Sequence, residues 1–464
     1  MRLKTYLYTL FFISLCYMLA VSGSGCAQIS APTGGPKDSI PPRLVKAVPE
    51  LNSVNFKNTK ITLTFDEYID VQDLSNNLLI SPLPLANPVV DFKLRTVTVK
   101  LKDSLLPNTT YTINFGNAIR DNNEGNPYKN FTYVFSTGNN IDSLQFSGKV
   151  TLAETGKTDS TLTAMLYRNT DDSAVKKNRP NYLAKLNGDG VFTFTNLSPG
   201  TYKVYALKDG DGGKTYNAKT ELFAFADTPV TISLVNTPVD LYAFAEEKRV
   251  EGATLLSRAT AIIKKLLYTS SVATQNQDLQ GDLELNFNKP LKKFNPSGII
   301  LTDTGFAPIP LASIVLDSSR KKISITAKWL EDRPYRLIIN SAAIADSQGN
   351  SIAKNDTLRF VTKKEADYGN VVLHFSNIDL TKHPVLQFVV ADEIKESYAL
   401  TGNDWNKNLF KPGEYEIRIL FDSNNNGKWD TGDFSKKIQP EKAVTLPQKL
   451  SIRANWDNER DIKL

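Results

Sequence analysis

The segment from Asp422 to Asp433 has the residue types and the spacing of a calcium-binding loop. Calcium takes about six to eight oxygen ligands, and such a loop supplies them from its positions 1, 3, 5, 7, 9 and 12, with glycine at position 6. Gly427 falls on that sixth position. The predicted ligands are Asp422, Asn424, Asn426, the carbonyl of Lys428, Asp430 and Asp433. Calcium is the one cofactor that the sequence suggests.

Two features separate this loop from an EF-hand. Asp433 is shorter than the glutamate usual at position 12, and the flanking segments have strand-like rather than helical patterns. The alternative is a hairpin loop rich in Asn and Gly, since these residues tolerate left-handed backbone conformations. An earlier segment, Asp209-Gly210-Asp211-Gly212-Gly213, resembles a truncated copy of the loop and is a weaker calcium candidate.

Trp429 lies inside this otherwise polar loop. Most tryptophans of a small β-sandwich pack in its core, so a tryptophan in a polar loop is a candidate ligand-binding residue. We predict that Trp429 stacks on a ligand such as a sugar. The other tryptophans, Trp329, Trp405 and Trp456, are more simply explained as core residues.

Catalytic patterns are sparse. The chain has two histidines, His374 in a strand-like stretch and His383 beside a proline. It has no Gly-x-Ser-x-Gly elbow, no His-Glu-x-x-His helix and no phosphate-binding glycine loop near a strand–helix junction. A pair of carboxylates could still form a glycosidase, but small repeated modules occupy the chain and leave no room for a barrel of about 250 residues. We therefore predict that the protein is not an enzyme, with a carboxylate glycosidase as a less favoured alternative.

The first residues predict export. Arg2 and Lys4 precede an apolar run, residues 6–21, and the small residues 22–25 then lead to Cys26. A basic start, a short apolar run and a small-residue site are typical of a secretory signal peptide, which we place at 1–25. The run is shorter than the ~20 residues that a spanning helix needs; an uncleaved anchor helix is the alternative.

Ser24-Gly25-Cys26 resembles the lipobox of bacterial lipoproteins. The resemblance implies cleavage before Cys26 and acylation of its thiol, for instance with palmitate, and several acyl chains on one residue give stable anchoring. Gram-negative lipoproteins that stay in the inner membrane tend to have Asp after the cysteine; here that residue is Ala27, so the resemblance implies the outer membrane. Residues 26–42, rich in Pro and Gly, are expected to form a tether. The sequence leaves open whether the body faces the periplasm or the medium.

After residue 42 the pattern is almost wholly strand-like. Alternating stretches such as 61–65, 97–101 and 111–115 place apolar residues on one face and are separated by Asn, Asp, Gly and Pro turns. A sheet with one apolar face needs a second sheet to close its core. The predicted fold class is all-β: a tandem array of small antiparallel β-sandwiches.

Two internal repeats divide the chain. Phe65-Asp66-Glu67 recurs as Phe287-Asn288-Lys289, an offset of 222 residues, and Leu197-Ser198-Pro199-Gly200-Thr201-Tyr202 recurs as Phe410-Lys411-Pro412-Gly413-Glu414-Tyr415, an offset of 213 residues. Ordered matches of this kind indicate duplication of a two-module unit. The predicted modules are 43–138, 139–236, 276–363 and 364–464, with a connector at 237–275.

The first and third modules resemble the bacterial Ig-like domain first described in S-layer proteins. The resemblance is carried by Phe65-Asp66-Glu67, Leu106-Pro107-Asn108-Thr109-Thr110-Tyr111, Ile119-Arg120-Asp121 and Phe135-Ser136-Thr137. The Pro-Gly-x-Tyr turns of the other two modules are similar to those of transthyretin-like and collagen-adhesin B-type sandwiches. The tether followed by an Ig-like module also resembles Bacteroidetes envelope lipoproteins, which implies a location and an architecture without a defined activity.

One part of the connector has a helical period. Its apolar residues recur every three or four positions, namely Leu255, Leu256, Ala259, Ile262, Ile263, Leu266 and Leu267. We predict a short linking helix, or a strand, packed between the two halves. The alternative is a helix that binds a partner or a membrane surface.

The charge gives no sign of a nucleic-acid partner, because the net charge of +6 comes from 55 basic and 49 acidic residues spread along the chain. We interpret the sequence as an envelope lipoprotein, anchored in the outer membrane through Cys26, with a structural or adhesive role and with protein or polysaccharide partners. A polysaccharide-binding accessory lipoprotein is the second hypothesis.

Overall fold

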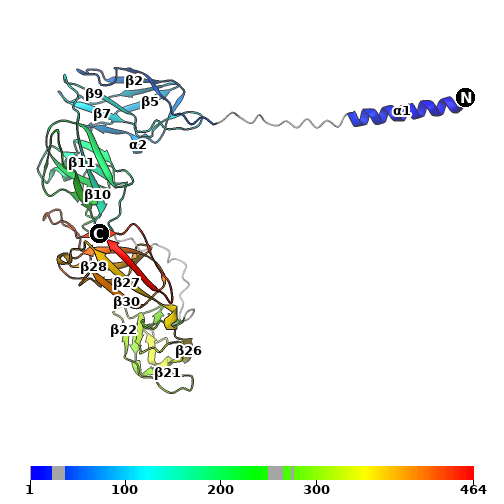
Figure 1. Ribbon diagram of the computed structural model, residues 1–464, viewed down its shortest axis with the longest axis vertical. Helices are drawn as coiled ribbons and strands as arrows, with labels where there is room; N and C mark the ends of the chain where they lie inside the picture. The colour runs from blue at the N-terminus through cyan, green and yellow to red at the C-terminus, as the bar shows by residue number, and fades with distance from the viewer. Residues whose placement is uncertain (1, 23–36, 249–264, 273–275) are drawn as a thin grey trace. The chain divides into compact units, whose positions relative to one another are not determined.

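The computed structural model describes residues 2–22, 37–248, 265–272 and 276–464. The chain forms two compact units. The first comprises residues 1–80 and 84–141, and the second comprises residues 81–83 and 142–464. The described part of both units consists almost entirely of β-strands (Figure 1).

Helices are few and mostly short among the described residues. The longest, α1 (Arg2–Ser22), covers the predicted signal segment, and its outward side chains include the exposed Phe11 and Phe12. No helix in the described part of the chain is long and apolar enough to span a bilayer. The short helices are α2 (Leu74–Asn77), α3 (Ala174–Lys177), η1 (Pro296–Gly298), η2 (Ser341–Ala343), η3 (Glu365–Asp367) and η4 (Leu380–Lys382).

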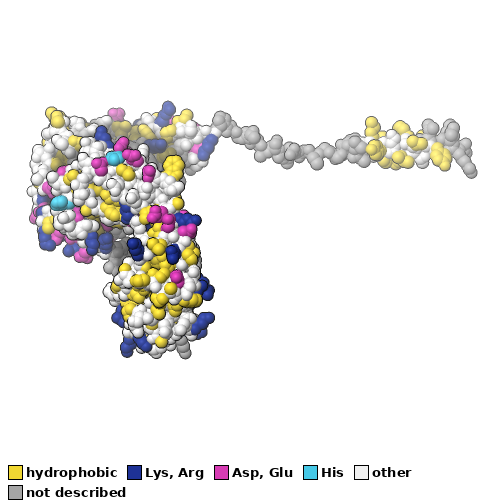
Figure 2. All heavy atoms as spheres, turned by 60° about the horizontal axis from the view of Figure 1, so that its bottom comes forward, with side chains coloured by type: hydrophobic (Ala, Val, Ile, Leu, Met, Phe, Trp, Pro, Cys, Tyr) yellow, Lys and Arg dark blue, Asp and Glu magenta, His cyan; other side chains and the backbone are white. Residues whose placement is uncertain are grey.

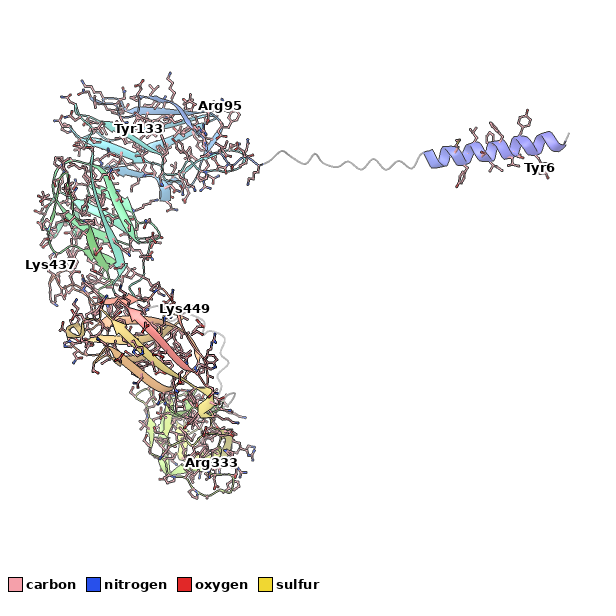
Figure 3. The ribbon with its side chains drawn as sticks, viewed as in Figure 1. Tyr6, Arg95, Tyr133, Arg333, Lys437 and Lys449 are labelled. Atoms are coloured by element: carbon pink, nitrogen blue, oxygen red, sulfur yellow. The ribbon has the colours of Figure 1, made fainter. Side chains whose placement is uncertain are left out.

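Module 1 contains β1 to β9 and lies in the first unit except for residues 81–83. A four-stranded sheet has the order β1-β2-β6-β5, a three-stranded sheet has the order β4-β7-β9, and β3 pairs with β8. Apolar residues alternate along β2 and β9, so one face of each strand enters the core, where Tyr133 of β9 (labelled in Figure 3) is fully buried. The strands are β1 (Leu44–Val48), β2 (Lys60–Phe65), β3 (Ile69–Val71), β4 (Leu79–Ser81), β5 (Val89–Lys93), β6 (Thr96–Lys100), β7 (Thr110–Asn114), β8 (Ile119–Asp121) and β9 (Thr132–Ser136).

Module 2 contains β10 to β17. One sheet has the order β13-β10-β17, with β10 and β17 parallel; the other has the order β12-β11-β14-β15, and β16 also pairs with β14. The strands are β10 (Leu144–Leu152), β11 (Thr163–Tyr167), β12 (Tyr182–Lys185), β13 (Val191–Leu197), β14 (Gly200–Leu207), β15 (Phe223–Phe225), β16 (Val230–Ile232) and β17 (Val239–Ala243).

Module 3 contains β18 to β26. Its sheets have the orders β18-β19-β23-β22 and β21-β24-β26, and β20 pairs with β25. The strands are β18 (Tyr268–Ser270), β19 (Leu283–Phe287), β20 (Leu291–Phe294), β21 (Ile299–Thr302), β22 (Ser313–Leu316), β23 (Lys322–Thr326), β24 (Pro334–Ile339), β25 (Ile344–Asp346) and β26 (Asp356–Val361).

Module 4 contains β27 to β34. Its sheets have the orders β30-β27-β34, with β27 and β34 parallel, and β29-β28-β31-β32, with β33 also paired to β31. The strands are β27 (Gly369–Ser376), β28 (Pro384–Val390), β29 (Glu393–Ala399), β30 (Asp404–Phe410), β31 (Gly413–Phe421), β32 (Lys442–Thr445), β33 (Leu450–Ile452) and β34 (Asp457–Lys463).

The strand orders repeat. Modules 1 and 3 share one topology, and modules 2 and 4 share another, strand for strand. The all-β class, the tandem sandwiches and the repeats predicted from the sequence are therefore confirmed. Residues 237–275, predicted as a connector, contribute β17 to a sheet of module 2 and β18 to a sheet of module 3.

The predicted linking helix falls largely outside the described residues. Leu255, Leu256, Ala259, Ile262 and Ile263 lie in the range 249–264 that the structure does not describe. Of the two remaining residues of the apolar pattern, one is buried in the core of module 3 and the other is exposed; these are Leu266 and Leu267 respectively.

Candidate functional site

The predicted calcium loop joins β31 to β32 in module 4. Asp422 directly follows β31 and is fully buried. Its carboxylate accepts hydrogen bonds from the backbone N–H of Asn426 at 3.2 Å and of Gly427 at 2.5 Å. Gly427 has a φ of 77°, a left-handed conformation that glycine adopts without strain. The buried carboxylate of Asp422 therefore stabilises the turn through these two hydrogen bonds.

Three of the other predicted ligands form one group. The amides of Asn424 and Asn426 both donate to the carboxylate of Asp430, the second at 2.7 Å. The side-chain oxygen of Asn426 accepts from the N–H of Lys428 at 2.7 Å. Asn424, Asn426 and Asp430 are thus close together, and all three carry the oxygen atoms that calcium prefers.

Asp433 does not belong to that group. Its carboxylate accepts hydrogen bonds from the Ser435 hydroxyl and from the N–H of Lys436, and it pairs with the Lys436 ammonium at 2.9 Å. The Ser435 hydroxyl and the Lys436 ammonium hold the pKa of Asp433 far below its ordinary value. Of the six predicted ligands, Asp433 is the one held in another turn. The calcium assignment as a whole stays a prediction.

Glu441 organises the loop and was not predicted from the sequence. Its carboxylate accepts from the N–H of Ser423 at 2.7 Å and from the N–H of Asp430 at 3.0 Å. Its backbone carbonyl accepts the indole N–H of Trp429 at 2.7 Å. Glu441 therefore ties the two ends of the loop together. Its position directly before a strand is the signal that could have revealed it.

Module 2 has an equivalent loop between β14 and β15. Asp209, Asp211 and Glu221 have carboxylate oxygens within 4.8 Å of one another, so this group could hold a metal ion. The ammonium of Lys214 pairs with Asp209 at 2.9 Å and supplies part of the charge that a cation would bring. Hydrogen bonds from the N–H of Gly213 and the amide of Asn217 lower the pKa of Asp211. The weaker calcium candidate of the sequence therefore has the denser group of carboxylates.

The tryptophans differ in exposure. Trp429 is partly buried and donates its indole N–H to the carbonyl of Glu441. Its ligand-binding role stays a prediction. Trp329 is buried in module 3, whereas Trp456 is 60% exposed and the Arg453 guanidinium lies 5.4 Å from its ring centroid. Among these residues, Trp456 presents the accessible ring, so the expectation that it is a core residue is wrong.

The two histidines lie in module 4. Both ring nitrogens of His374 face carboxylates, Asp404 at 2.6 Å and Glu459 at 3.0 Å. The Asp404 and Glu459 carboxylates raise the pKa of His374 above its ordinary value. Acidic side chains lie close to histidine at the surface in Figure 2. This arrangement lies on an exposed sheet face, with His374 as part of an ion-pair network.

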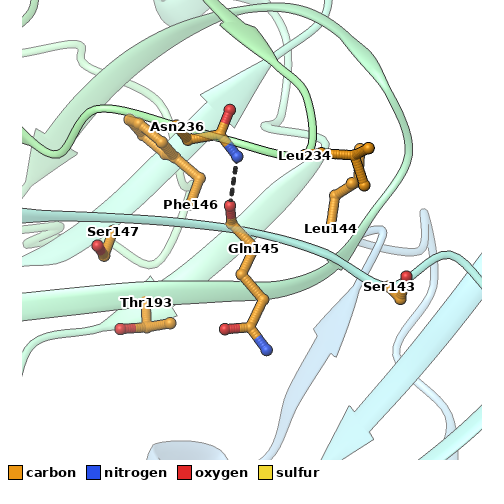
Figure 4. A pocket seen from close by; sticks show the side chains of 8 residues that line it. All are labelled: Ser143, Leu144, Gln145, Phe146, Ser147, Thr193, Leu234 and Asn236. Atoms are coloured by element: carbon orange, nitrogen blue, oxygen red, sulfur yellow. Dashed lines mark hydrogen bonds between the residues drawn. The ribbon is translucent and has the colours of Figure 1, made fainter.

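A hollow of about 480 Å³ borders the start of β10 in module 2. Its lining includes Gln145, Phe146 and the loop residue Leu234, and the Asn236 amide donates to the carbonyl of Gln145 at 2.7 Å (Figure 4). Leu234 is 92% exposed. The residues that line this hollow include no titratable side chain, so it offers uncharged polar and apolar contacts rather than acid–base chemistry.

Cys26, the predicted lipidation site, lies in the range 23–36 that the structure does not describe.

The comparisons with known proteins agree with the fold of module 1. Residues 38–137 match the family model described as a bacterial Ig-like domain. This match shows an Ig-like domain in the chain and carries no activity with it. No curated protein is detectably similar to the chain.

Several solved structures align with the chain at low identity. The major pilin subunit BcpA of Bacillus cereus aligns at 9% identity over 69% of this chain and 99% of its own, with a TM-score of 0.17. The Bacillus anthracis TIE protein aligns at 11% over 93% and 76%, with a TM-score of 0.18. The N-terminal part of the bacterial S-layer protein SbsC aligns at 16% over 45% of each chain, with a TM-score of 0.16. Scores this low carry no argument about function.

Proposed function

We propose that the protein is a membrane-anchored envelope lipoprotein with a structural or adhesive role and without enzymatic activity. The observation that carries this proposal is the duplicated module architecture, in which each module buries its own apolar core. Sandwiches that are stable around separate cores can be strung together as spacers or supports. The Ig-like match of residues 38–137 supports the same proposal.

The anchor in this proposal is Cys26. Support comes from the apolar helix α1, the small residues 22–25 that follow it, and the Pro- and Gly-rich segment before module 1. Acyl chains on Cys26 would hold the chain at the outer membrane, and the tether would keep module 1 away from the lipid surface.

The test of the anchor compares two variants of the full chain. Cys26→Ala is expected to abolish incorporation of labelled palmitate and to move the protein out of the membrane fraction. Cys16→Ala, the same change within the signal segment, is the control and should leave both unchanged. Retention of Cys26→Ala in the membrane fraction would contradict the lipoprotein assignment. Protease treatment of intact cells then decides between the periplasmic and the surface face.

A second candidate function is polysaccharide binding by loops of module 4. The observation that favours it is the exposed ring of Trp456 beside Arg453, together with the partly buried Trp429 in the polar loop. A glycan array with the wild-type chain, Trp429→Ala and Trp456→Ala tests it. Reproducible sugar binding lost in one of the variants supports this function; binding of no sugar by the wild type excludes it. Turnover of a polymeric substrate would instead point to a carboxylate glycosidase.

A further inference from the structure

The two loops that follow β14 and β31 differ in length by seven residues. Asp209 and Asp422 occupy equivalent positions with an offset of 213, whereas Glu221 and Glu441 occupy equivalent positions with an offset of 220. The longer loop of module 4 therefore contains an addition. The segment from Thr431 to Gln439 of this longer loop is named the docking loop.

The docking loop carries an aromatic side chain onto module 2. Phe434 is only 3% exposed although it belongs to a loop. Its ring centroid lies 5.9 Å from Tyr205, 6.1 Å from Tyr216, 5.0 Å from Phe223 and 5.2 Å from Phe225. These four residues of module 2 are named the aromatic face. Four neighbouring rings in edge-on or tilted arrangements are a favourable surrounding for a phenylalanine.

Hydrogen bonds fix the loop on both sides of Phe434. The Thr431 hydroxyl donates to the carbonyl of Ala245 at 2.7 Å, and the N–H of Phe434 donates to the carboxylate of Glu246 at 3.2 Å. At the other end, the Gln439 amide donates to the carbonyl of Phe225 at 3.0 Å and to Asp227 at 2.7 Å.

A basic residue of the loop adds an ion pair. The ammonium of Lys437 lies 2.8 Å from the carboxylate of Asp172 in module 2. The same ammonium lies 3.9 Å from the ring centroid of Phe434. Lys437 is labelled in Figure 3, where modules 2 and 4 adjoin.

The aromatic face is particular to module 2. The strand registers make Tyr205 equivalent to Arg418, Phe223 to Ala443 and Phe225 to Thr445. One copy of the duplicated sheet thus has an aromatic outer face, and the other has a polar and small one. Module 2 therefore carries the aromatic face and module 4 carries the longer loop. The two modules supply complementary sides of one contact.

A second contact between modules 2 and 4 lies beside the docking loop. The N–H of Ala443 in β32 donates to the carbonyl of Ala153 at 2.8 Å. Lys157 pairs with Asp392 at 2.7 Å and with Glu416 at 2.9 Å. A Cβ added to Gly156 would lie 2.5 Å from the carbonyl oxygen of Ala443, so the backbones meet closely.

We propose that the docking loop and the aromatic face lock modules 2 and 4 into one cooperative body, although module 3 separates them in the sequence. The partner of the aromatic face is therefore a segment of the same chain. This proposal does not depend on the membrane anchor or on the proposed function.

The test uses hydrogen exchange measured by mass spectrometry on the full chain. Phe434→Ala is expected to raise the exchange rate at Ala443 by about tenfold or more. The N–H of Ala443 bonds across the contact, and removing a buried phenylalanine lowers the stability of that contact. Exchange in β7 of module 1 should stay unchanged, because Phe434 is not part of the core of module 1. Phe306→Ala, at a phenylalanine of module 3 that is mostly exposed, is the matched control and should change neither.

A second variant disturbs the contact without removing an apolar side chain. A Cβ at position 432 would lie 2.7 Å from the Phe244 ring of module 2 and 2.7 Å from the carbonyl oxygen of Ile438. Gly432→Ala is therefore expected to raise the exchange rate at Ala443 in the same direction.

Three results would overturn the proposal. One is unchanged exchange at Ala443 in both variants. Another is a loss of protection confined to module 4, with module 2 unchanged, which would make Phe434 a residue of module 4 alone. The third is a wild-type oligomer that Phe434→Ala dissociates in light scattering, because the loop would then dock on a second copy.

Discussion

At the scale of single residues, the repeated motifs are held by hydrogen bonds from one polar side chain to nearby backbone. The hydroxyl of Tyr202 donates to the carbonyl of Ser198 at 2.9 Å, and that of Tyr415 donates to the carbonyl of Lys411 at 3.1 Å. Both bonds cross a Pro-Gly turn whose glycine has a φ above 150°. The Pro-Gly-x-Tyr pattern is therefore repeated because its tyrosine closes the turn.

The aspartate of the Ig-like motif has a similar role. Asp121 accepts the backbone N–H of Glu124, Gly125 and Asn126. Burial alone would raise its pKa, but these hydrogen bonds outweigh burial and lower it. In module 3, the Asn350 amide and backbone N–H groups lower the pKa of Asp346 to about 2. The motif aspartates thus organise loops.

His374 gives a prediction about pH. Because Asp404 and Glu459 stabilise the protonated ring, the pKa of His374 in the folded chain lies above the ordinary value of about 6.5. The folded state gains stability from this proton at pH below that value, and loses it as the pH rises through the folded pKa. NMR titration of the two histidines should give a midpoint above 6.5 for His374, with His383→Gln used to assign the signals. A midpoint at or below 6.5 would contradict the ion-pair geometry.

At the scale of elements, the loop after β31 combines two features. Its first half brings Asp422, Asn424, Asn426 and Asp430 together, and its second half is the docking loop. Glu441, next to β32, accepts hydrogen bonds from both the start and the end of the first half. A substitution in the first half is therefore expected to affect the docking loop as well, because the docking loop follows it directly in the chain.

Calcium binding by this loop is directly testable. We expect millimolar calcium to raise the melting temperature of the full chain, since a ligand that binds only the folded state stabilises it by about 2.7 kcal/mol at a hundred times its Kd. Asp430→Asn should remove most of the rise. Asp433→Asn should preserve the rise, because the Asp433 carboxylate is bonded to Ser435 and Lys436 rather than to the other predicted ligands. An identical melt in chelator and in excess calcium would leave a hairpin loop as the explanation.

The sequence predicts some elements well and others poorly, for physical reasons. Motif turns are visible because Asp, Gly, Pro and Tyr each perform a local task at a fixed spacing. The contact of the docking loop with module 2 cannot be predicted from the sequence, because Phe434 lies among Asp433, Lys436 and Lys437 and has the local pattern of an exposed polar turn. Its burial depends on residues more than 200 positions earlier. For the same reason, periodicity does not distinguish the exposed Trp456 from the partly buried Trp429.

At the scale of the second unit, docking of modules 2 and 4 should couple their unfolding. Calorimetry of the full chain is expected to show these two modules melting in one transition. Phe434→Ala should lower that transition by about 6–12 °C, taking about 3 kcal/mol for a buried phenylalanine and about 2–4 °C per kcal/mol for a body of this size. The control variant Phe306→Ala should leave it in place. Two transitions already present in the wild type would show that the docked modules unfold independently.

The order of the modules along the chain also bears on how the protein is made. Synthesis proceeds from the N-terminus at about 5–20 residues per second. Phe434 follows Phe225 by 209 residues, so roughly 10–40 seconds of translation separate the aromatic face from the loop that covers it. During that interval a cluster of tyrosine and phenylalanine rings has no cover from module 4. The nascent chain would therefore be most prone to aggregation, and most in need of a chaperone, after module 2 has been synthesised and before module 4 is complete.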